Sequence, residues 1–411
     1  MSAPAQIPDG LTTVPHTEPE GGVPTVIDSP RAFERTIAAF AAASGPVAAD
    51  AERASGIRYG QATYLAQLKR AGAGIALIDP VALPDLSALG KAIGDAEWIL
   101  HAASQDLPGL ADHGLTPARL FDTELAARLL GIPRVGLASI VAECLGLELA
   151  KEFSNVDWSK RPLPADWLRY AALDVDVLIE LRDVLAQRLA DAGKLQWALQ
   201  EFEAVRTTPP AEPRVDPWRR TSGITAFKDA RRLAVVRALW QAREDSARNR
   251  NIAPGRVLPD RAIVAAAQAL PRTAGQLVRV SEFAGQGQRR RAAQWQRAID
   301  EALNLPESAL PSTKGPHKEG PPQPRMWERR KPEAAGRLAA AREFMAAASE
   351  ELSTPVENLL PPEALRRLCW QPPMPVTATT VADALHTHGA RPWQVELFAA
   401  PLSKILKALG T

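Results

Sequence analysis

Cysteine is scarce in this chain, with two residues in 411, Cys144 and Cys369. Both lie in apolar segments that predict helices, and two cysteines are too few for the disulfide framework of a small secreted domain. The six histidines have no cysteine or histidine partners at zinc-finger spacing. We therefore expect two buried free thiols in a cytoplasmic protein, with neither a disulfide nor a zinc site.

Long apolar runs are missing as well. No stretch of about 18 apolar residues is present, so we expect no membrane span and no membrane partner. Residues 1–21 have no basic start followed by an apolar core, so we expect no signal peptide there. They are rich in proline and glycine, and we predict a disordered N-terminal segment.

Charge is balanced overall but not along the chain. The formal net charge is +2, yet residues 1–210 hold 18 basic and 27 acidic side chains, a net −9, and residues 211–411 carry a net +11. A basic half beside an acidic half is a known indication of nucleic-acid binding by the basic part. The acidic half is compatible with a metal-dependent catalytic domain.

Four carboxylates and one tyrosine stand in an order that suggests a common site. Asp50 and Glu52 follow an apolar strand pattern and share one face of it, because side chains alternate with a period of two. Asp106 comes after a second strand, and Tyr170 and Asp174 lie four apart on a predicted helix. Crowded carboxylates need a cation, and hard oxygen ligands favour Mg²⁺ or Mn²⁺. The pattern indicates a divalent-metal site.

This ordered set resembles the DEDD superfamily of 3′-5′ exonucleases, in its tyrosine-bearing branch. The strings FDTELAARLLG (121–131), VDWSKRPL (156–163) and LRYAALDVDVL (168–178) make the chain similar to the ribonuclease D family in particular. That family usually carries threonine between the first two acids and phenylalanine after the second. Here these positions are Ala51 and Arg53, and we expect Arg53 to change how the terminal base or sugar is held.

The resemblance implies a role for each residue of the set. Asp50 would bridge two metal ions, Glu52 and Asp174 would complete one ion site, and Asp106 would hold the second ion. Tyr170 would orient the attacking water, because a phenol with a pKa of about 10 is a poor base at neutral pH. The cofactor expected from the resemblance is two ions of Mg²⁺ or Mn²⁺ per site.

The expected fold is an α/β ribonuclease H-like exonuclease domain, a mixed sheet with flanking helices, followed by two all-α HRDC-like domains. Strands are predicted in the first part at 23–27, around Asp50, and in TYLAQL, GIALIDP and EWILHA, with helices almost throughout from Asp106 to about residue 205. The Asn251–Asp260 run and the Leu270-Pro-x-Thr turn carry the HRDC resemblance. The predicted boundaries are 1–21 (disordered segment), 22–206 (3′-5′ exonuclease domain), 207–219 (linker), 220–304 (HRDC domain), 305–333 (flexible linker) and 334–409 (second HRDC-like domain).

Other polar residues near these motifs have structural interpretations. We expect His101 to be a hydrogen-bonded structural histidine, and Asp122 to cap the helix that begins in FDTELAA. Trp158 and Arg161 would fix the loop before the helix that carries Asp174. Asp176 points away from Asp174 on a helix and is excluded as a ligand.

In the basic half, Arg289, Arg290 and Arg291 are the candidate nucleic-acid-binding residues, with Trp295 nearby. A similar group surrounds Trp327. The arginines predict weak, sequence-independent phosphate contacts, and the tryptophans are either stacking surfaces for bases or core residues.

The predicted activity is metal-dependent 3′-5′ exoribonuclease cleavage that releases nucleoside 5′-monophosphates from single-stranded 3′ ends. The resemblance implies RNA partners, namely precursors of transfer RNA and other stable RNAs. Two alternatives remain open, a DNA-directed 3′-5′ exonuclease and a non-catalytic RNA-binding scaffold. The oligomeric state is not determined by the sequence, although a monomer is favoured.

Overall fold

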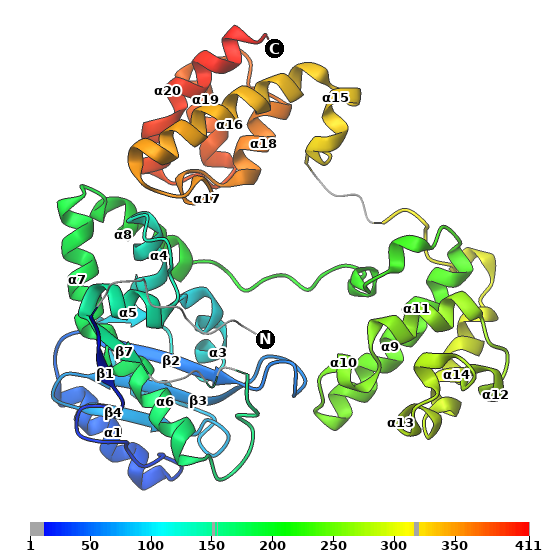
Figure 1. Ribbon diagram of the computed structural model, residues 1–411, viewed down its shortest axis with the longest axis horizontal. Coiled ribbons are helices and arrows are strands. Elements are labelled where there is room, and N and C mark those ends of the chain that lie inside the picture. The colour runs from blue at the N-terminus through cyan, green and yellow to red at the C-terminus, as the bar shows by residue number, and fades with distance from the viewer. Residues whose placement is uncertain (1–11, 150–152, 154, 316–319, 411) are drawn as a thin grey trace.

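The computed structural model describes residues 12–149, 153, 155–315 and 320–410 (Figure 1). It consists of an N-terminal α/β domain and two all-α units, which we call the first and second helical units. The predicted architecture, a mixed sheet with flanking helices followed by two helical units, is confirmed. Within the described residues, no helix combines the length and apolar character needed to cross a bilayer.

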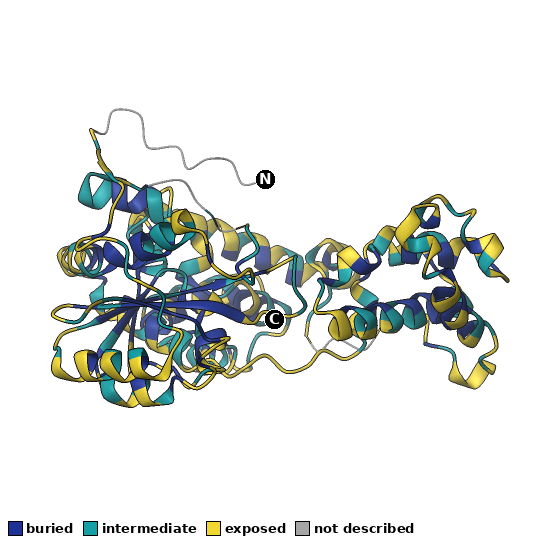
Figure 2. Ribbon diagram, turned by 90° about the horizontal axis from the view of Figure 1, so that it is seen from below, coloured by how far each residue is buried: buried dark blue, intermediate teal, exposed yellow. Residues whose placement is uncertain are grey.

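The N-terminal domain is built on a five-stranded sheet with the order β4-β3-β2-β5-β6. β2 pairs antiparallel with β3 and parallel with β5, so the sheet is mixed, and β2 lies at its centre. The strands are rich in alanine, leucine and isoleucine and are buried between layers of helices (Figure 2). The strands are β2 (Val47–Arg53), β3 (Thr63–Arg70), β4 (Gly74–Ile78), β5 (Glu97–Leu100) and β6 (Arg119–Asp122).

Among the described residues of this domain, eight α-helices surround the sheet. α6 packs across β2, β3 and β4, and α7 and α8 continue from it in the direction of the second helical unit (Figure 1). The helices are α1 (Pro30–Ala42), α2 (Ser87–Ile93), α3 (Leu107–Ala111), α4 (Thr123–Leu129), α5 (Leu137–Leu145), α6 (Ala165–Asp176), α7 (Leu178–Asp191) and α8 (Leu195–Arg206).

Three predictions about this domain were wrong. Within 1–21, residues 1–11 lie outside the described part, but Val14–His16 forms strand β1, parallel to β7 (Leu147–Leu149). In the expected strand at 23–27 only Ile27 makes a bridge, to Ile78. Strands β6 and β7 fall in a stretch predicted to be helical. All of these are strand segments of five residues or fewer, which are too short to show a period and depend on a neighbouring strand.

The first helical unit follows an exposed chain at 207–215 (Figure 1). Its core includes Leu239, Ile263 and Phe283, together with Trp295, which is fully buried. The helices are α9 (Ala230–Arg250), α10 (Pro254–Val257), α11 (Asp260–Ala269), α12 (Ala274–Leu277), α13 (Gln286–Arg289) and α14 (Ala292–Leu303).

The second helical unit begins earlier than its predicted boundary at residue 334. Trp327 lies in the expected linker 305–333, yet it is fully buried and its ring lies 5.0 Å from that of Trp370. The helices are α15 (Trp327–Arg330), α16 (Pro332–Leu352), α17 (Val356–Leu359), α18 (Pro362–Trp370), α19 (Ala378–Thr387) and α20 (Pro392–Ala408).

The two helical units contain the same sequence of elements. The longest helix of each unit, α9 or α16, has 21 residues and ends at a left-handed residue, Asn251 or Ser353. A helix of four residues follows, and a proline, Pro259 or Pro361, then caps the next helix. This shared order was only weakly visible in the sequence.

The second helical unit is tightly docked on the N-terminal domain, and the two share one apolar core. Trp197 on α8 stacks on Trp393 of α20, with ring centroids 4.6 Å apart. Lys194 Nζ donates hydrogen bonds to Leu129 O (2.8 Å) in the N-terminal domain, and to Leu352 O (2.5 Å) and Thr354 Oγ1 (2.9 Å) in the helical unit. The arrangement therefore depends on a buried ammonium group as well as on apolar contacts.

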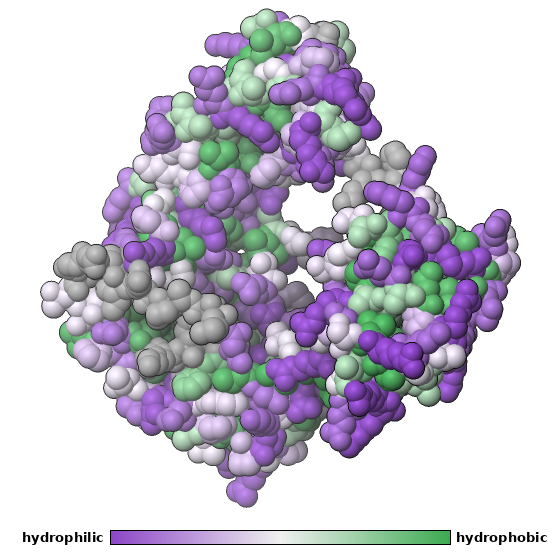
Figure 3. Space-filling model, turned by 45° about the vertical axis from the view of Figure 1, so that its right-hand side comes forward, coloured by the Kyte–Doolittle hydropathy of each residue, from purple (hydrophilic) through white to green (hydrophobic). Residues whose placement is uncertain are grey.

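The first helical unit contacts the N-terminal domain through the β2–β3 loop. Ala253 N donates to Ile57 O (2.9 Å), Arg256 Nε donates to Gly56 O (2.8 Å), and the Arg248 guanidinium lies over the Tyr59 ring. Figure 3 shows a gap between the three units, with hydrophilic side chains covering much of the first helical unit. The loop that follows strand β2 is thus held by a second domain.

The docking contact yields a prediction. We expect Lys194→Met to lower the free energy of unfolding by about 1–3 kcal/mol, because it leaves buried carbonyl oxygens without their donor. Lys404→Met, which removes an exposed ammonium group from α20, should change it by less than about 0.5 kcal/mol. Urea unfolding of both variants measures the difference, and equal effects would contradict the role given to Lys194.

Candidate active site

The predicted carboxylates come from three elements that meet at one edge of the sheet. Asp50 and Glu52 lie near the end of β2, and Asp106 follows the parallel neighbour β5. Parallel neighbours end at the same edge, so residues after these two strands come together. Asp174 lies on α6, which packs across β2 and β3. The pairing of β2 with β5 and the packing of α6 on the sheet thus bring the four carboxylates to one place.

Three of the four carboxylates form a tight group. Oxygen atoms of Asp50, Glu52 and Asp174 all lie within 4.8 Å of one another. Three carboxylate oxygens converging at this distance suit a hard divalent cation, so these residues fit the metal that the sequence implied. Asp106 does not belong to this group. Its Oδ1 lies 3.2 Å from Arg53 Nη2.

The raised pKa values of three of these carboxyl groups indicate that a nearby positive charge would stabilise their ionised forms. Burial raises the pKa of Glu52 well above its usual value, and the negative charges of Asp50, Asp174 and Asp106 add to the shift. Burial, followed by the charge of Asp50, raises the pKa of Asp106 to about 8, although Arg53 acts in the opposite direction. The pKa of Asp50 is also raised, mainly by burial. Without a cation, the site holds protons on carboxylates that are ordinarily ionised.

Tyr170 joins the group from the preceding turn of α6. Its hydroxyl donates a hydrogen bond to Asp174, and its pKa is raised far above the usual value by burial and then by the charges of Asp174, Glu52 and Asp50. Its ring lies beside Trp158 and Phe153. The phenol is therefore neutral near pH 7 and can act as a hydrogen-bond donor but not as a proton acceptor.

The turn that carries Asp106 is held by Asp122. The Asp122 carboxylate accepts hydrogen bonds from Ala102 N (3.2 Å) and Ala103 N (2.9 Å), and also caps α4 as the sequence predicted. Ala102 has a left-handed backbone with φ of 57°. A non-glycine residue in this region costs energy that surrounding contacts must offset. Asp122 thus keeps a strained turn in the shape that presents Asp106.

His101 has the predicted structural role. Its Nδ1 lies 3.0 Å from Thr123 Oγ1. Burial lowers the pKa of the imidazole to about 4, so the ring is neutral at physiological pH. A neutral, hydrogen-bonded ring at this position supports the strand ends and adds no charge to the site.

The loop before α6 is fixed as expected. Arg161 donates to both carboxylate oxygens of Asp79 (2.6 and 2.7 Å) and to the carbonyl of Tyr64 (2.8 Å), and Trp158 is fully buried. Asp176 faces away from the carboxylates and accepts from Lys69 Nζ at 2.7 Å. These contacts anchor both ends of α6 and leave Tyr170 and Asp174 in place.

Two residues near the carboxylates were missed or given another role by the sequence analysis. Arg53 was expected to change how the terminal base or sugar is held, and in the structure it pairs with Asp106 and donates to Gln105 O at 2.7 Å. Gln67 lies directly opposite Asp50 in the β2–β3 register and is fully buried, and neither of its amide atoms has a described hydrogen-bond partner. Cross-strand neighbours share a face. The sequence signal that could have identified Gln67 is a polar residue in the middle of an otherwise apolar strand pattern in β3.

The basic cluster is only in part as the sequence suggested. Arg289 and Arg290 are exposed, while Arg291 is half-buried and donates weakly to Val257 O at 3.4 Å. Trp295 is fully buried and donates to Gln288 Oε1. Trp327 is buried too, so neither tryptophan offers a surface on which a base could stack.

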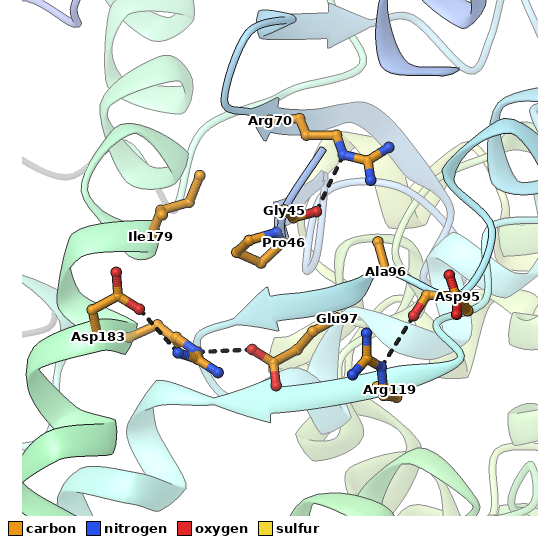
Figure 4. Close-up of a pocket in the computed structure, with 10 residues that line it drawn as sticks. Gly45, Pro46, Arg70, Asp95, Ala96, Glu97, Arg119, Ile179 and Asp183 are labelled. Atoms are coloured by element: carbon orange, nitrogen blue, oxygen red, sulfur yellow. Dashed lines mark hydrogen bonds and ion pairs between the residues drawn. The ribbon is translucent and has the colours of Figure 1, made fainter. Parts of the chain in front are cut away.

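A separate pocket lies at the other edge of the sheet (Figure 4). It is lined by residues that precede or begin β2, β5 and β6, the strand ends opposite to the carboxylates. Its arginines are already engaged: Arg70 donates to Gly45 O, Arg119 to Asp95 O, and Arg182 to Glu97. Nothing in it points to catalysis.

Family models match each part of the chain. Residues 24–190 match a model described as 3′-5′ exonuclease, and residues 232–299 match one described as HRDC domain. Residues 320–406 match a third model, described as 3′ to 5′ exonuclease C-terminal domain. The third match starts before Trp327 and so agrees with the earlier start of the second helical unit.

Curated relatives with sequence similarity carry the name ribonuclease D. One from Gluconacetobacter diazotrophicus is 33% identical over 298 residues, which cover 70% of this chain and 72% of that protein. One from a Shewanella species is 35% identical over 223 residues, 53% of this chain and 57% of that protein. In the second case the matching part spans little more than half of the relative.

Two solved structures are similar over nearly the whole chain. A crystal structure of a protein from Bifidobacterium adolescentis has a TM-score of 0.88 and 41% identity, covering 96% of this chain and 99% of that one. Escherichia coli RNase D, described as an exoribonuclease involved in structured RNA processing, has a TM-score of 0.65 and 26% identity, covering 94% and 99%.

The raised pKa of Asp106 predicts a pH effect on the metal-free protein. The folded state holds this proton up to about pH 8 and the unfolded state only to about pH 4, so stability falls as pH rises between these values. In a chelator, the free energy of unfolding should therefore drop from about pH 6 to pH 9, and Asp106→Asn should flatten the drop. Urea titrations at both pH values measure it. The prediction is contradicted if the free energy of unfolding of Asp106→Asn depends on pH as steeply as that of the wild type. It is also contradicted if Asp112→Asn, a change at an exposed site, flattens the pH dependence equally.

Proposed function

The chain belongs to the ribonuclease D family of 3′-5′ exoribonucleases, and we propose that it shortens single-stranded RNA 3′ ends by two-metal-ion hydrolysis. The products are nucleoside 5′-monophosphates, and the substrates are precursors of transfer RNA and other stable RNAs. The observation that carries the proposal is that carboxylate oxygens of Asp50, Glu52 and Asp174 lie within 4.8 Å of one another. The Tyr170 hydroxyl donates a hydrogen bond to Asp174 beside them.

Each carboxylate has its own part in holding the ions. As the family resemblance implies, Asp50 would be a ligand of both ions. Glu52 and Asp174, whose oxygen atoms converge with those of Asp50 within 4.8 Å, would complete the first ion site, and Asp106 would contribute to the second. When bound, Mg²⁺ or Mn²⁺ ions polarise the phosphodiester, activate a water and stabilise the leaving 3′ oxygen.

Tyr170 positions the attacking water. Its hydroxyl is neutral and donates to Asp174, so its oxygen can accept a hydrogen bond from water at the edge of the carboxylate group. Orientation of this kind contributes to the rate without proton transfer to the phenol. Trp158 and Phe153 hold the ring in place.

RNA is favoured over DNA as the substrate because curated relatives of this chain are named ribonuclease D. The DNA-directed alternative concerns the same carboxylates, since an exonuclease site of this kind does not by itself read the sugar. Comparing labelled single strands that end in ribose or deoxyribose, with Mn²⁺ and with chelator, separates the two. Equal rates on both would remove the preference for RNA.

If these residues catalyse hydrolysis, one substitution should abolish the activity and a second should lower its rate in part. Asp50→Asn should abolish Mn²⁺-dependent release of monophosphates, and Tyr170→Phe should lower the maximal rate by about 10²-fold, or about 2.7 kcal/mol of barrier, with little change in RNA affinity. The matched controls, Asp112→Asn and Tyr59→Phe, make the same changes outside the carboxylate group and should retain the full rate. Single-turnover assays on a labelled oligoribonucleotide give both quantities. Near-normal turnover by Asp50→Asn would refute the assigned mechanism.

We assign RNA retention to the basic half, residues 211–411, and treat the second helical unit as a diverged copy of the first. The net charge of +11 and the exposure of Arg289 and Arg290 support phosphate contacts, while the shared element order supports the duplication. Phosphate binding of this kind keeps RNA near the catalytic domain but contributes no catalytic group. The domain limits that fit are 12–206, 217–310 and 320–410, the first of which includes strand β1.

Phosphate contacts by these arginines predict a change in salt dependence. The double variant Arg289→Ala/Arg290→Ala should bind RNA more weakly and reduce the logarithmic salt slope by about 0.7 for each lost contact. Arg31→Ala/Arg35→Ala removes the same charge from exposed positions on α1 and should leave the slope unchanged. Binding of a labelled single strand across a salt series tests this. Identical slopes for the two double variants would argue for a different role of the first helical unit.

A further inference from the structure

Arg53 is a cation inside the carboxylate site that the proposed function does not use. It follows Glu52 directly, and its guanidinium lies 3.2 Å from Asp106 Oδ1 while donating to Gln105 O at 2.7 Å. The Asp106 side chain is nearly buried at 7% exposure, and that of Arg53 is 23% exposed. A hydrogen bond to the main chain beside the ion pair gives the guanidinium a defined position.

The local backbone explains how Arg53 reaches this side. The β2–β3 register is regular from Val47 to Glu52 and then shifts between Glu52 and Arg53, where Arg53 pairs with Thr63. Irregularities of this kind re-aim a side chain next to active sites. The shift ends the strict alternation of β2, and the Arg53 side chain reaches Asp106 on the neighbouring turn.

The ion pair divides the four carboxylates into two kinds. Asp50, Glu52 and Asp174 converge with their oxygen atoms within 4.8 Å of one another and are ready to share a cation. Asp106 already has a cationic neighbour. A divalent ion that approaches Asp106 meets a fixed positive charge at the same carboxylate, and the repulsion between two cations at such short range is large.

We propose that Arg53 is a built-in counter-ion of Asp106 that makes metal uptake sequential. The first ion binds at Asp50, Glu52 and Asp174, and the second binds only when the Arg53 guanidinium leaves Asp106. The proposal rests on the proposed function, to which it adds the order and relative strength of the two binding steps. Arg53 acts through Asp106 and is a positioning residue, not a catalytic one.

The test is a calorimetric titration of Mn²⁺ into the metal-free, full-length protein. The wild type should show two steps, the second at least about tenfold weaker. Arg53→Met, which keeps the length of the side chain but removes the charge, should tighten the second step by about tenfold and change the first much less. Arg53→Lys keeps a positive charge but lacks the planar guanidinium group. Its affinity for the second Mn²⁺ ion should therefore lie between those of the wild type and Arg53→Met.

Two further variants separate a specific contact from a general charge effect. Arg58→Met removes a guanidinium from the loop that follows Arg53, where it contacts Asp157 and Ser159, and should leave both Mn²⁺ steps unchanged. Asp106→Asn should abolish the second step, and adding Arg53→Met to it should then have no further effect on Mn²⁺ binding. Such non-additivity is the signature of a direct coupling between the two residues.

Thermal unfolding gives a readout that is independent of binding heats. Arg53→Met should lower the midpoint of the metal-free protein, because the carboxylates lose their counter-ion, and Mn²⁺ should raise it by more than in the wild type. The inference is overturned if Arg53→Met leaves the second step unchanged or weakens it, if Arg58→Met has the same effect, or if neither wild type nor Arg53→Met takes up a second ion. The first two outcomes leave the proposed function standing, and that function is tested separately by whether Asp50→Asn still hydrolyses RNA.

Discussion

The mutual repulsion of four carboxylates is the constraint on which the rest of the site depends. Asp50, Glu52, Asp106 and Asp174 are brought to one edge of the sheet, and burial makes the charges of Asp50, Glu52 and Asp106 costly. A fold that keeps such groups together has to supply positive charge from elsewhere. Arg53 supplies part of it, and divalent ions are suited to supply the remainder.

Holding like charges in place requires a rigid frame, and the frame consists of polar contacts outside the cluster. Arg161 with Asp79 fixes the start of α6, and Lys69 with Asp176 fixes its end. Asp122 holds the strained turn before Asp106. These ion pairs and hydrogen bonds are at least partly buried, so they resist the repulsion where surface pairs would contribute little.

The two helical units pack against the N-terminal domain and add to this frame. The second unit shares a core with the N-terminal domain, and Gly131 allows the close approach, because a Cβ at this position would lie 2.3 Å from Ser353 O. The first unit holds the β2–β3 loop, which directly follows Arg53. Removing either unit would therefore disturb the catalytic domain itself, and point substitutions separate RNA retention from catalysis more cleanly than truncation does.

Much of the site was determined by the sequence alone. The spacing of Asp50 and Glu52 on a strand, of Tyr170 and Asp174 on a helix, and the cap at Asp122 are local patterns that need only the period of a strand or a helix. Tertiary structure decided the remainder, because pairing between distant segments has no local signal. It turned Val14–His16 and Arg119–Asp122 into strands and buried Trp295 and Trp327 as core residues. It also set Arg53, the last residue of β2, against Asp106 on the turn after β5, and these two segments meet only when the sheet forms.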